Sequence, residues 1–97
     1  MDLNDFQALI EKMYSHKDRL RGSAGTFLWL TEEIGELAAA IGEGTREEKA
    51  LEFADVLAWL ATLANVEGIN LSEAVRTKYG SGCPGCGKFI CTCNEKP

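Results

Sequence analysis

The chain has 97 residues, 45% of them hydrophobic, and a formal net charge of −5, which suits one domain with a modest core. The negative charge argues against a nucleic-acid-binding surface, because such surfaces carry clustered lysine and arginine side chains. The sequence lacks an apolar run of about 18 residues, which argues against membrane insertion, and its acidic start is unlike a secretory leader. We therefore expect a cytoplasmic protein.

The helical spacing of apolar residues predicts four helices and no strand. In chain order, these helices cover about residues 3–20, 27–41, 46–66 and 71–79. Thr26 and Thr45 are placed to cap the second and third helices, and Glu48 completes a capping box with Thr45. The sequence therefore predicts an all-α, four-helix domain over residues 1–80 and a separate Cys-rich tail over residues 81–97.

The second and third predicted helices carry acids that should meet. The short turn GEGT joins these helices, so they should run antiparallel. Acids spaced i, i+3 occur on both: Glu33 and Glu36 on the second helix, Glu52 and Asp55 on the third. Counted outward from the turn, at about 1.5 Å per residue, the two pairs lie at matching heights. Four carboxylates should therefore converge between the helices.

Four like charges in one place repel each other unless a cation lies among them. We expect no lysine or arginine on these helix faces near the acids. A hard divalent cation, Mg²⁺ or Mn²⁺, suits an all-carboxylate site. The alternative is a solvated acidic face, which we accept for Glu43, Glu47 and Glu48 near the turn and leave open for Glu32.

Two tryptophans fit the same geometry. Trp29 precedes Glu33 by one helical turn, and Trp59 follows Asp55 by one turn. An antiparallel hairpin places both tryptophans at one end of the carboxylate cluster. Two aromatic side chains beside a metal site could hold a flat base; alternatively, each is an ordinary core residue.

The run EEIGE, followed after fifteen residues by EFAD, matches the pattern EExxE…ExxD. Over about residues 5–80 the sequence resembles the MazG-like nucleotide pyrophosphohydrolases of the all-α NTP pyrophosphohydrolase superfamily. The resemblance implies Mg²⁺-dependent hydrolysis of nucleoside triphosphates to monophosphate and pyrophosphate, in the removal of non-canonical or surplus nucleotides, by a homo-dimer or tetramer. The alternatives are a dedicated dCTP, dUTP or phosphoribosyl-ATP pyrophosphohydrolase, or a non-catalytic helical binding module.

The resemblance also implies roles for individual residues. By motif position, the metal ligands are Glu33, Glu36, Glu52 and Asp55. Glu32 matches an extra glutamate that orients or deprotonates the attacking water, and Lys78 matches a lysine that contacts phosphate. Thr62 stands where larger members often carry an asparagine, so a role in binding sugar or base is in doubt at that position.

Basic residues gather near the end of the first predicted helix. Lys12, Lys17 and Arg21 are placed to reach a phosphate, but they also suit a solvated helix end, where cations are favourable. His16, the one histidine of the sequence, lies among them and is expected at the surface.

The tail holds four cysteines, spaced C-x2-C-x4-C-x-C: Cys83, Cys86, Cys91 and Cys93. The first pair, with its neighbouring proline and glycines, looks like a zinc knuckle. Four thiolates form a closed tetrahedral site for a structural Zn²⁺. Free thiols, a redox pair or disulfides are the alternatives, and a reducing compartment disfavours disulfides.

Overall fold

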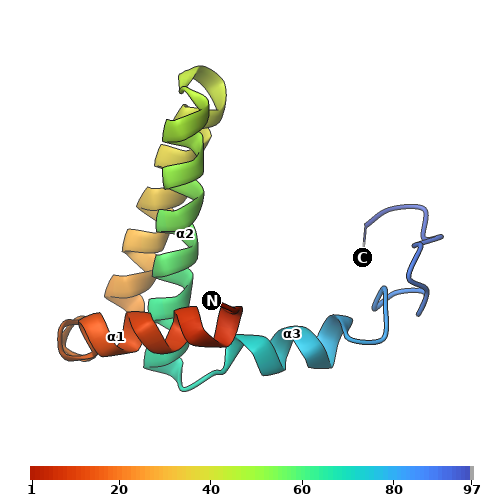
Figure 1. Cartoon of the computed structure of the whole chain (residues 1–97), viewed down its shortest axis with the longest axis horizontal. Helices are drawn as coiled ribbons and strands as arrows, with labels where there is room; N and C mark the ends of the chain where they lie inside the picture. The colour runs from red at the N-terminus through yellow and green to blue at the C-terminus, as the bar shows by residue number, and fades with distance from the viewer. Residues whose placement is uncertain (97) are drawn as a thin grey trace.

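The computed structural model describes residues 1–96 and consists of three helices: α1 (Leu3–Glu43), α2 (Arg46–Glu67) and α3 (Leu71–Tyr79). No strand occurs within the described residues, and the all-α prediction is confirmed. Figure 1 shows α2 alongside the C-terminal part of α1, whereas the N-terminal part of α1 crosses the foot of this hairpin and α3 leads away from it. Across residues 1–96, no helix combines the length and apolar character needed to cross a membrane.

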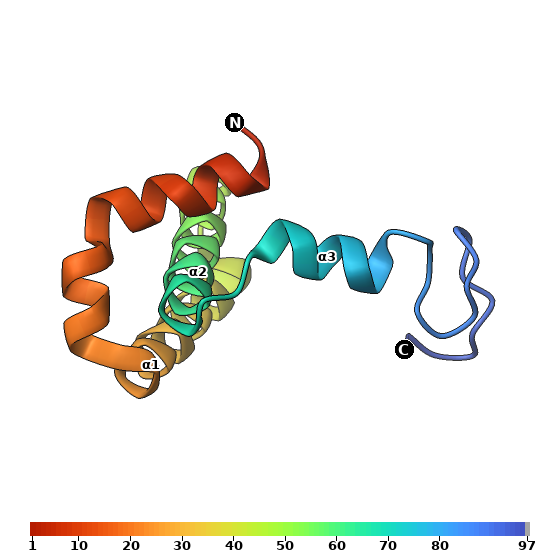
Figure 2. The same ribbon diagram turned by 90° about the horizontal axis from the view of Figure 1, so that it is seen from below.

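The predicted number of helices is wrong, because α1 takes the place of the first two. Its backbone leaves helical geometry at Gly22, where φ is 76° and ψ is 177°. Only glycine adopts such torsion angles readily, so Gly22 allows α1 to bend into two halves with different directions (Figures 1 and 2). The predicted N-cap at Thr26 is also wrong, because Thr26 lies inside α1 and is fully buried, with 0% of its surface exposed.

The ends of the helices follow from local capping. Asp2 caps α1 and accepts a hydrogen bond from the Asp5 N–H at 2.7 Å. The predicted capping box at the start of α2 is confirmed: the Glu48 N–H donates to Thr45 Oγ1 at 3.2 Å, and the Thr45 N–H donates to Glu48 Oε1 at 3.0 Å. Gly68 ends α2 with a left-handed φ of 71°.

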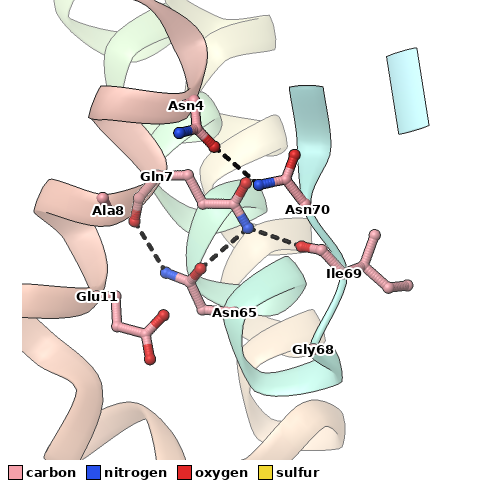
Figure 3. A pocket seen from close by; sticks show the side chains of 8 residues that line it. All are labelled: Asn4, Gln7, Ala8, Glu11, Asn65, Gly68, Ile69 and Asn70. Atoms are coloured by element: carbon pink, nitrogen blue, oxygen red, sulfur yellow. Dashed lines mark hydrogen bonds between the residues drawn. The ribbon is translucent and has the colours of Figure 1, made fainter. Parts of the chain in front are cut away.

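A hydrogen-bond network around the buried Gln7 joins the start of α1 to the α2–α3 junction (Figure 3). Gln7 Nε2 donates to Asn65 Oδ1 at 3.0 Å and to the Ile69 carbonyl at 2.7 Å. Gln7 Oε1 accepts from the Leu71 N–H at 2.8 Å, and Asn65 Nδ2 donates to the Gln7 carbonyl at 3.2 Å. These polar groups supply hydrogen-bond partners to one another, so their role is to hold the helices together. The hollow of about 370 Å³ beside them therefore belongs to a structural junction.

The hydrophobic core of one chain is small. Its buried apolar side chains are Ile10, Leu30, Ala61 and Ala64. Other large apolar side chains of α1 are exposed, among them Met13, Leu20, Ile34 and Ile41. Large apolar side chains therefore remain in contact with water on the surface of the α1–α2 hairpin.

Candidate active site

Three carboxylates meet where α1 and α2 lie side by side. Glu33, Glu36 and Glu52 each place an oxygen within 4.8 Å of the others. α1 contributes the first two, which are about one helical turn apart, and α2 contributes the third. The Oε2 atoms of Glu33 and Glu52 are inaccessible to water and have no hydrogen-bond partner within residues 1–96. A cation would satisfy these two buried oxygens.

The pKa values of Glu33 and Glu52 are both raised. Burial is the largest cause for Glu33, and the negative charges of Glu36 and Asp55 add to it. The same causes, in the same order, raise the pKa of Glu52. A divalent cation would lower both pKa values, because it favours the charged form of each carboxylate.

Asp55 lies next to this cluster, outside the group of three. Its side chain is exposed on α2, and its charge acts on both Glu33 and Glu52. Within residues 1–96, the ion pairs join Arg19 to Glu11 and Arg21 to Asp18. No lysine or arginine in that part of the chain therefore forms an ion pair with the acids of the cluster. The site therefore has the donor set and the uncompensated charge that a divalent cation requires.

A hollow of about 340 Å³ adjoins the cluster through Asp55, which lines it. This volume lies at the lower end of the range for small-molecule sites, about 300–1,000 Å³. α2 contributes Trp59 and Thr62 to its wall, and the part of α1 before Gly22 contributes other residues, including Tyr14, Lys17, Asp18 and Arg21. We did not identify Tyr14 and Asp18 from the sequence, because their position depends on the bend in α1. The feature of the sequence that could have indicated this bend is Gly22, which lies between two helical patterns.

The two tryptophans contact each other. The ring centroids of Trp29 and Trp59 are 5.7 Å apart, and the ring planes differ by 12°. This spacing is that of a direct aromatic pair, about 4.5–7 Å, so the rings do not enclose a flat ligand between them. The Arg21 guanidinium lies 4.8 Å from the Trp59 ring centroid, a cation–π contact. Trp59 also lines the hollow.

Two other residues singled out from the sequence lie apart from the carboxylates that meet. Glu32 is exposed on α1, next to Glu33 in the chain. Lys78 lies near the end of α3, with its ammonium 5.7 Å from the ring centroid of Tyr79. Because α3 leads away from the hairpin (Figures 1 and 2), the structure does not bring Lys78 to the acids of its own chain.

The four cysteines form a second cluster. The sulfurs of Cys83, Cys86, Cys91 and Cys93 lie within 4.8 Å of one another, and all four are free thiols. Cys83 Sγ is 3.5 Å from Cys91 Sγ and 3.9 Å from Cys93 Sγ. Four thiolates around a tetrahedral zinc ion, at about 2.3 Å from it, lie about 3.8 Å apart. The sulfur spacing therefore fits a zinc site and is too long for disulfide bonds.

The backbone before and after Cys86 forms a tight turn. The Gly87 N–H donates to the Cys83 carbonyl at 2.7 Å, and the Cys83 N–H donates to the Lys88 carbonyl at 2.8 Å. Gly87 has a φ of 73°, which a residue with a side chain rarely adopts. The turn brings Cys83 and Cys86 together on one side of the tail.

The sequence matches a known protein family and a known protein. The sequence model of the protein family described as the MazG nucleotide pyrophosphohydrolase domain matches residues 21–85. A protein of Cyanophage S-2L, named dATP/dGTP diphosphohydrolase, is 43% identical over 58 residues, which cover 60% of this chain and 51% of that protein. The chain thus spans about half the length of this relative.

Proposed function

Because the chain belongs to the MazG nucleotide pyrophosphohydrolase domain family, we propose that it hydrolyses a nucleoside triphosphate to a nucleoside monophosphate and pyrophosphate. The convergence of Glu33, Glu36 and Glu52, with two buried oxygens lacking partners, carries this proposal. These residues lie within the matched region, residues 21–85. The motif that contains them therefore supports the same activity as the geometry.

The carboxylate cluster is the proposed site for Mg²⁺ or Mn²⁺. Its donors are all oxygen atoms, which these hard cations prefer. Glu33, Glu36 and Glu52 would hold the cation, and Asp55 is the proposed fourth ligand at the edge of the cluster. When bound, the cation supplies positive charge that offsets the charge of the phosphates. This matters because the carboxylates alone would repel a triphosphate.

The other proposed roles surround the reacting phosphate. Glu32 is the proposed residue that orients or deprotonates the attacking water, which forms a bond to phosphorus as the bond to pyrophosphate breaks. Lys17 lines the hollow beside Asp55 and is available to a phosphate group. Lys78 would contact phosphate from a second copy of the chain, because α3 leads away from its own hairpin (Figure 1).

The nucleoside part of the substrate is proposed to lie in the hollow against Trp59. The name of the cyanophage relative, dATP/dGTP diphosphohydrolase, favours a purine deoxynucleotide over the substrates of dCTP, dUTP or phosphoribosyl-ATP pyrophosphohydrolases. A panel of triphosphates, incubated with Mg²⁺ and assayed for pyrophosphate, tests the proposal. Pyrophosphate release identifies an enzyme, whereas nucleotide binding without release identifies a non-catalytic binding module.

A homo-dimer or tetramer is the proposed assembly. The single chain exposes large apolar side chains along the hairpin, among them Leu28, Leu51 and Phe53. Exposed apolar groups of this size are unfavourable in water and are typical of protein–protein interfaces. Burial of the same hairpin surface in each copy would explain why one chain has so small a core. Sedimentation of the full chain measures the assembly.

The tail is proposed to bind one structural Zn²⁺ through Cys83, Cys86, Cys91 and Cys93. The sulfur–sulfur distances of 3.5 and 3.9 Å support this proposal. Thiolates prefer zinc, whereas carboxylates and phosphates prefer magnesium, so the two clusters would select different ions. The zinc site would order the tail without taking part in the hydrolysis.

A further inference from the structure

The loop between the second and third cysteines of the tail presents two adjacent apolar side chains to water. Phe89 and Ile90, which we call the tail tip, are each 86% exposed. The backbone beside them is held in place: the Cys83 N–H donates to the Lys88 carbonyl at 2.8 Å, and a Cβ added at Gly82 would lie 2.9 Å from that carbonyl. The tail tip is therefore an apolar projection on a fixed segment of backbone.

A hollow on the α1–α2 hairpin is lined by apolar side chains that one chain leaves uncovered. Its volume is about 540 Å³, and we call it the bend groove because it begins directly after the bend of α1. The residues of its wall are Ser23, Ala24, Phe27, Leu28, Leu63 and Glu67. Phe27 and Leu28 are 57% and 71% exposed. Ser23 Oγ donates a hydrogen bond to Glu67 Oε2, so the groove is apolar with one negative charge fixed on its wall.

The tail tip and the bend groove of one chain lie on opposite sides of the hairpin. Figures 1 and 2 show the bend of α1 on one side of α2 and the Cys-rich tail on the other. Between hairpin and tail lies α3, a continuous helix over Leu71–Tyr79, which leads the tail away from the groove. The tail tip therefore does not cover the groove of its own chain, and an occupant of the groove comes from another molecule.

The two surfaces match in polarity and in charge. Insertion of large apolar side chains into an apolar groove removes both surfaces from water, which is the main favourable contribution to protein association. Lys88 directly precedes the tail tip, whereas Glu67 lies on the wall of the groove. Neither Lys88 nor Glu67 forms an ion pair within residues 1–96. Opposite charges at the two surfaces favour a contact between tip and groove and fix its register.

We propose that Phe89 and Ile90 of one copy insert into the bend groove of a second copy, where Lys88 faces Glu67. This inference rests on the homo-oligomer that the proposed function includes, and it assigns part of that interface to the Cys-rich tail. In a twofold dimer the contact forms twice, because each copy offers the same tip and the same groove. The zinc site would then serve the assembly by holding the tail tip in place.

Photo-cross-linking of the purified full chain locates the tail tip. Phe89 is replaced by p-benzoylphenylalanine, whose excited carbonyl inserts into a neighbouring C–H bond, and this chain is equilibrated with chain labelled with ¹⁵N. We expect a cross-linked dimer that contains one labelled chain, attached at residues 23–28 or 63–67. Attachment within one chain, attachment at other residues, or the absence of a cross-linked dimer would overturn the inference. Attachment only to a different protein, on irradiation in cells, would also overturn it.

Sedimentation equilibrium measures how much the tail tip contributes to assembly. The chain that carries both Phe89→Ser and Ile90→Ser should dissociate with a constant raised at least about 100-fold, because two large apolar groups no longer leave water on association. Its helical circular dichroism and zinc content should stay unchanged, since both side chains are exposed in the single chain. A dissociation constant equal to that of the unsubstituted chain would overturn the inference.

An exchange of charges tests which groups face each other. Lys88→Glu and Glu67→Lys should each raise the dissociation constant about two- to thirtyfold, since the exposed pair occurs twice in a dimer. The chain with both substitutions should assemble more tightly than either single variant. Lys96→Glu is the matched control, because it makes the same change in the same tail away from the tip, and it should assemble normally. Single losses that add up in the doubly substituted chain would contradict the inference.

These measurements separate the inference from the proposals on which it rests. A full chain that stays monomeric at every concentration would refute both the homo-oligomer and the tail contact. An assembly unchanged by the serine substitutions would refute the tail contact alone and leave the hairpin surface as the interface. Cross-linking into the bend groove without hydrolysis of any triphosphate would refute the proposed enzyme activity and leave the tail contact standing.

Discussion

The indole rings of Trp29 and Trp59 stack with their centroids 5.7 Å apart and join the two helices that carry the acidic cluster. Trp29 lies one helical turn before Glu33 on α1, and Trp59 lies one turn after Asp55 on α2. Trp59 also contacts the Arg21 guanidinium and lines the hollow. The pair is therefore placed to respond to a ligand that occupies this end of the hairpin.

Replacing Trp59 by leucine should weaken substrate binding more than replacing Trp29 by leucine, because Trp59 lines the hollow. Stacking of a base on an aromatic ring contributes about 1–3 kcal/mol, so the KM of Trp59→Leu should rise roughly 5- to 150-fold. Tryptophan fluorescence of the unsubstituted chain should change on addition of a non-hydrolysable triphosphate with Mg²⁺. No fluorescence change, together with unaltered KM in both variants, would make the two tryptophans ordinary packing residues.

The raised pKa values of Glu33 and Glu52 predict how stability depends on pH. An acid whose pKa is raised on folding stabilises the fold below its ordinary pKa of 4.5, and this contribution is lost as the pH rises through the raised value. The contribution of these two groups should therefore lower the melting temperature of the metal-free protein as the pH rises from about 4.5 towards neutrality. Mg²⁺ should restore it near neutral pH, because the cation binds the charged carboxylates.

Glu33→Gln provides the check on this pH dependence. The variant should be at least as stable as the unsubstituted metal-free protein near neutral pH, since it removes one charge from the cluster, and Mg²⁺ should stabilise it less. Melting curves with EDTA and with Mg²⁺, recorded across this pH range, measure both effects. A metal-free melting temperature that rises with pH in the unsubstituted chain but not in the variant would contradict the account.

The bend in α1 predicts opposite effects of alanine at two glycines of the same helix. At Gly22, with φ of 76° and ψ of 177°, alanine should destabilise the protein by about 1–3 kcal/mol through backbone strain. At Gly35, inside the helix and with no atom within 4 Å of an added Cβ, alanine should stabilise it by about 0.5–1 kcal/mol. Urea denaturation measures both. Equal effects at the two positions would mean that Gly22 is not required for the bend.

The cysteine tail should bind one zinc ion per chain. Elemental analysis of the full chain should find close to one equivalent of zinc, and Cys86→Ser should lose most of it. Because the carboxylate cluster is separate, the variant should keep its helical circular dichroism and its hydrolysis. A chain purified without zinc, whose four thiols titrate freely while the tail stays ordered, would contradict the zinc site. Complete loss of hydrolysis in a folded, normally assembled variant would place part of the active site in the tail.

The elements of the fold that depend on local sequence were predictable. Helical spacing gave the all-α class, and the Thr45 and Glu48 pair gave the start of α2, because a capping box is made by residues three apart in the chain. The interruption of the apolar pattern over residues 21–26 includes Gly22, where the bend lies, but the sequence also predicts an N-cap at Thr26, because a threonine side chain commonly accepts the hydrogen bond at that position. The backbone instead leaves helical geometry at Gly22 alone and continues as helix through Thr26.

The candidate site depends partly on local spacing and partly on tertiary structure. The i, i+3 spacing and the short turn were enough to predict that acids of two helices would lie close, and Glu33, Glu36 and Glu52 do so. The hollow was beyond prediction, because Asp18 and Trp59 are brought together only by the bend in α1. Many apolar side chains are exposed in one copy, so helical periodicity alone does not distinguish a face buried in the core from a face available to another chain.

The most direct test of the proposed activity is the identity of the products formed from a deoxynucleoside triphosphate. With Mg²⁺, the full chain should convert it to the monophosphate and pyrophosphate, and EDTA should stop the reaction. Glu52→Gln should abolish turnover and remain folded, whereas Glu47→Gln, an exposed residue in the first turn of the same helix, should keep it. Near-normal activity of Glu52→Gln with Mg²⁺, or release of orthophosphate in place of pyrophosphate, would contradict the account.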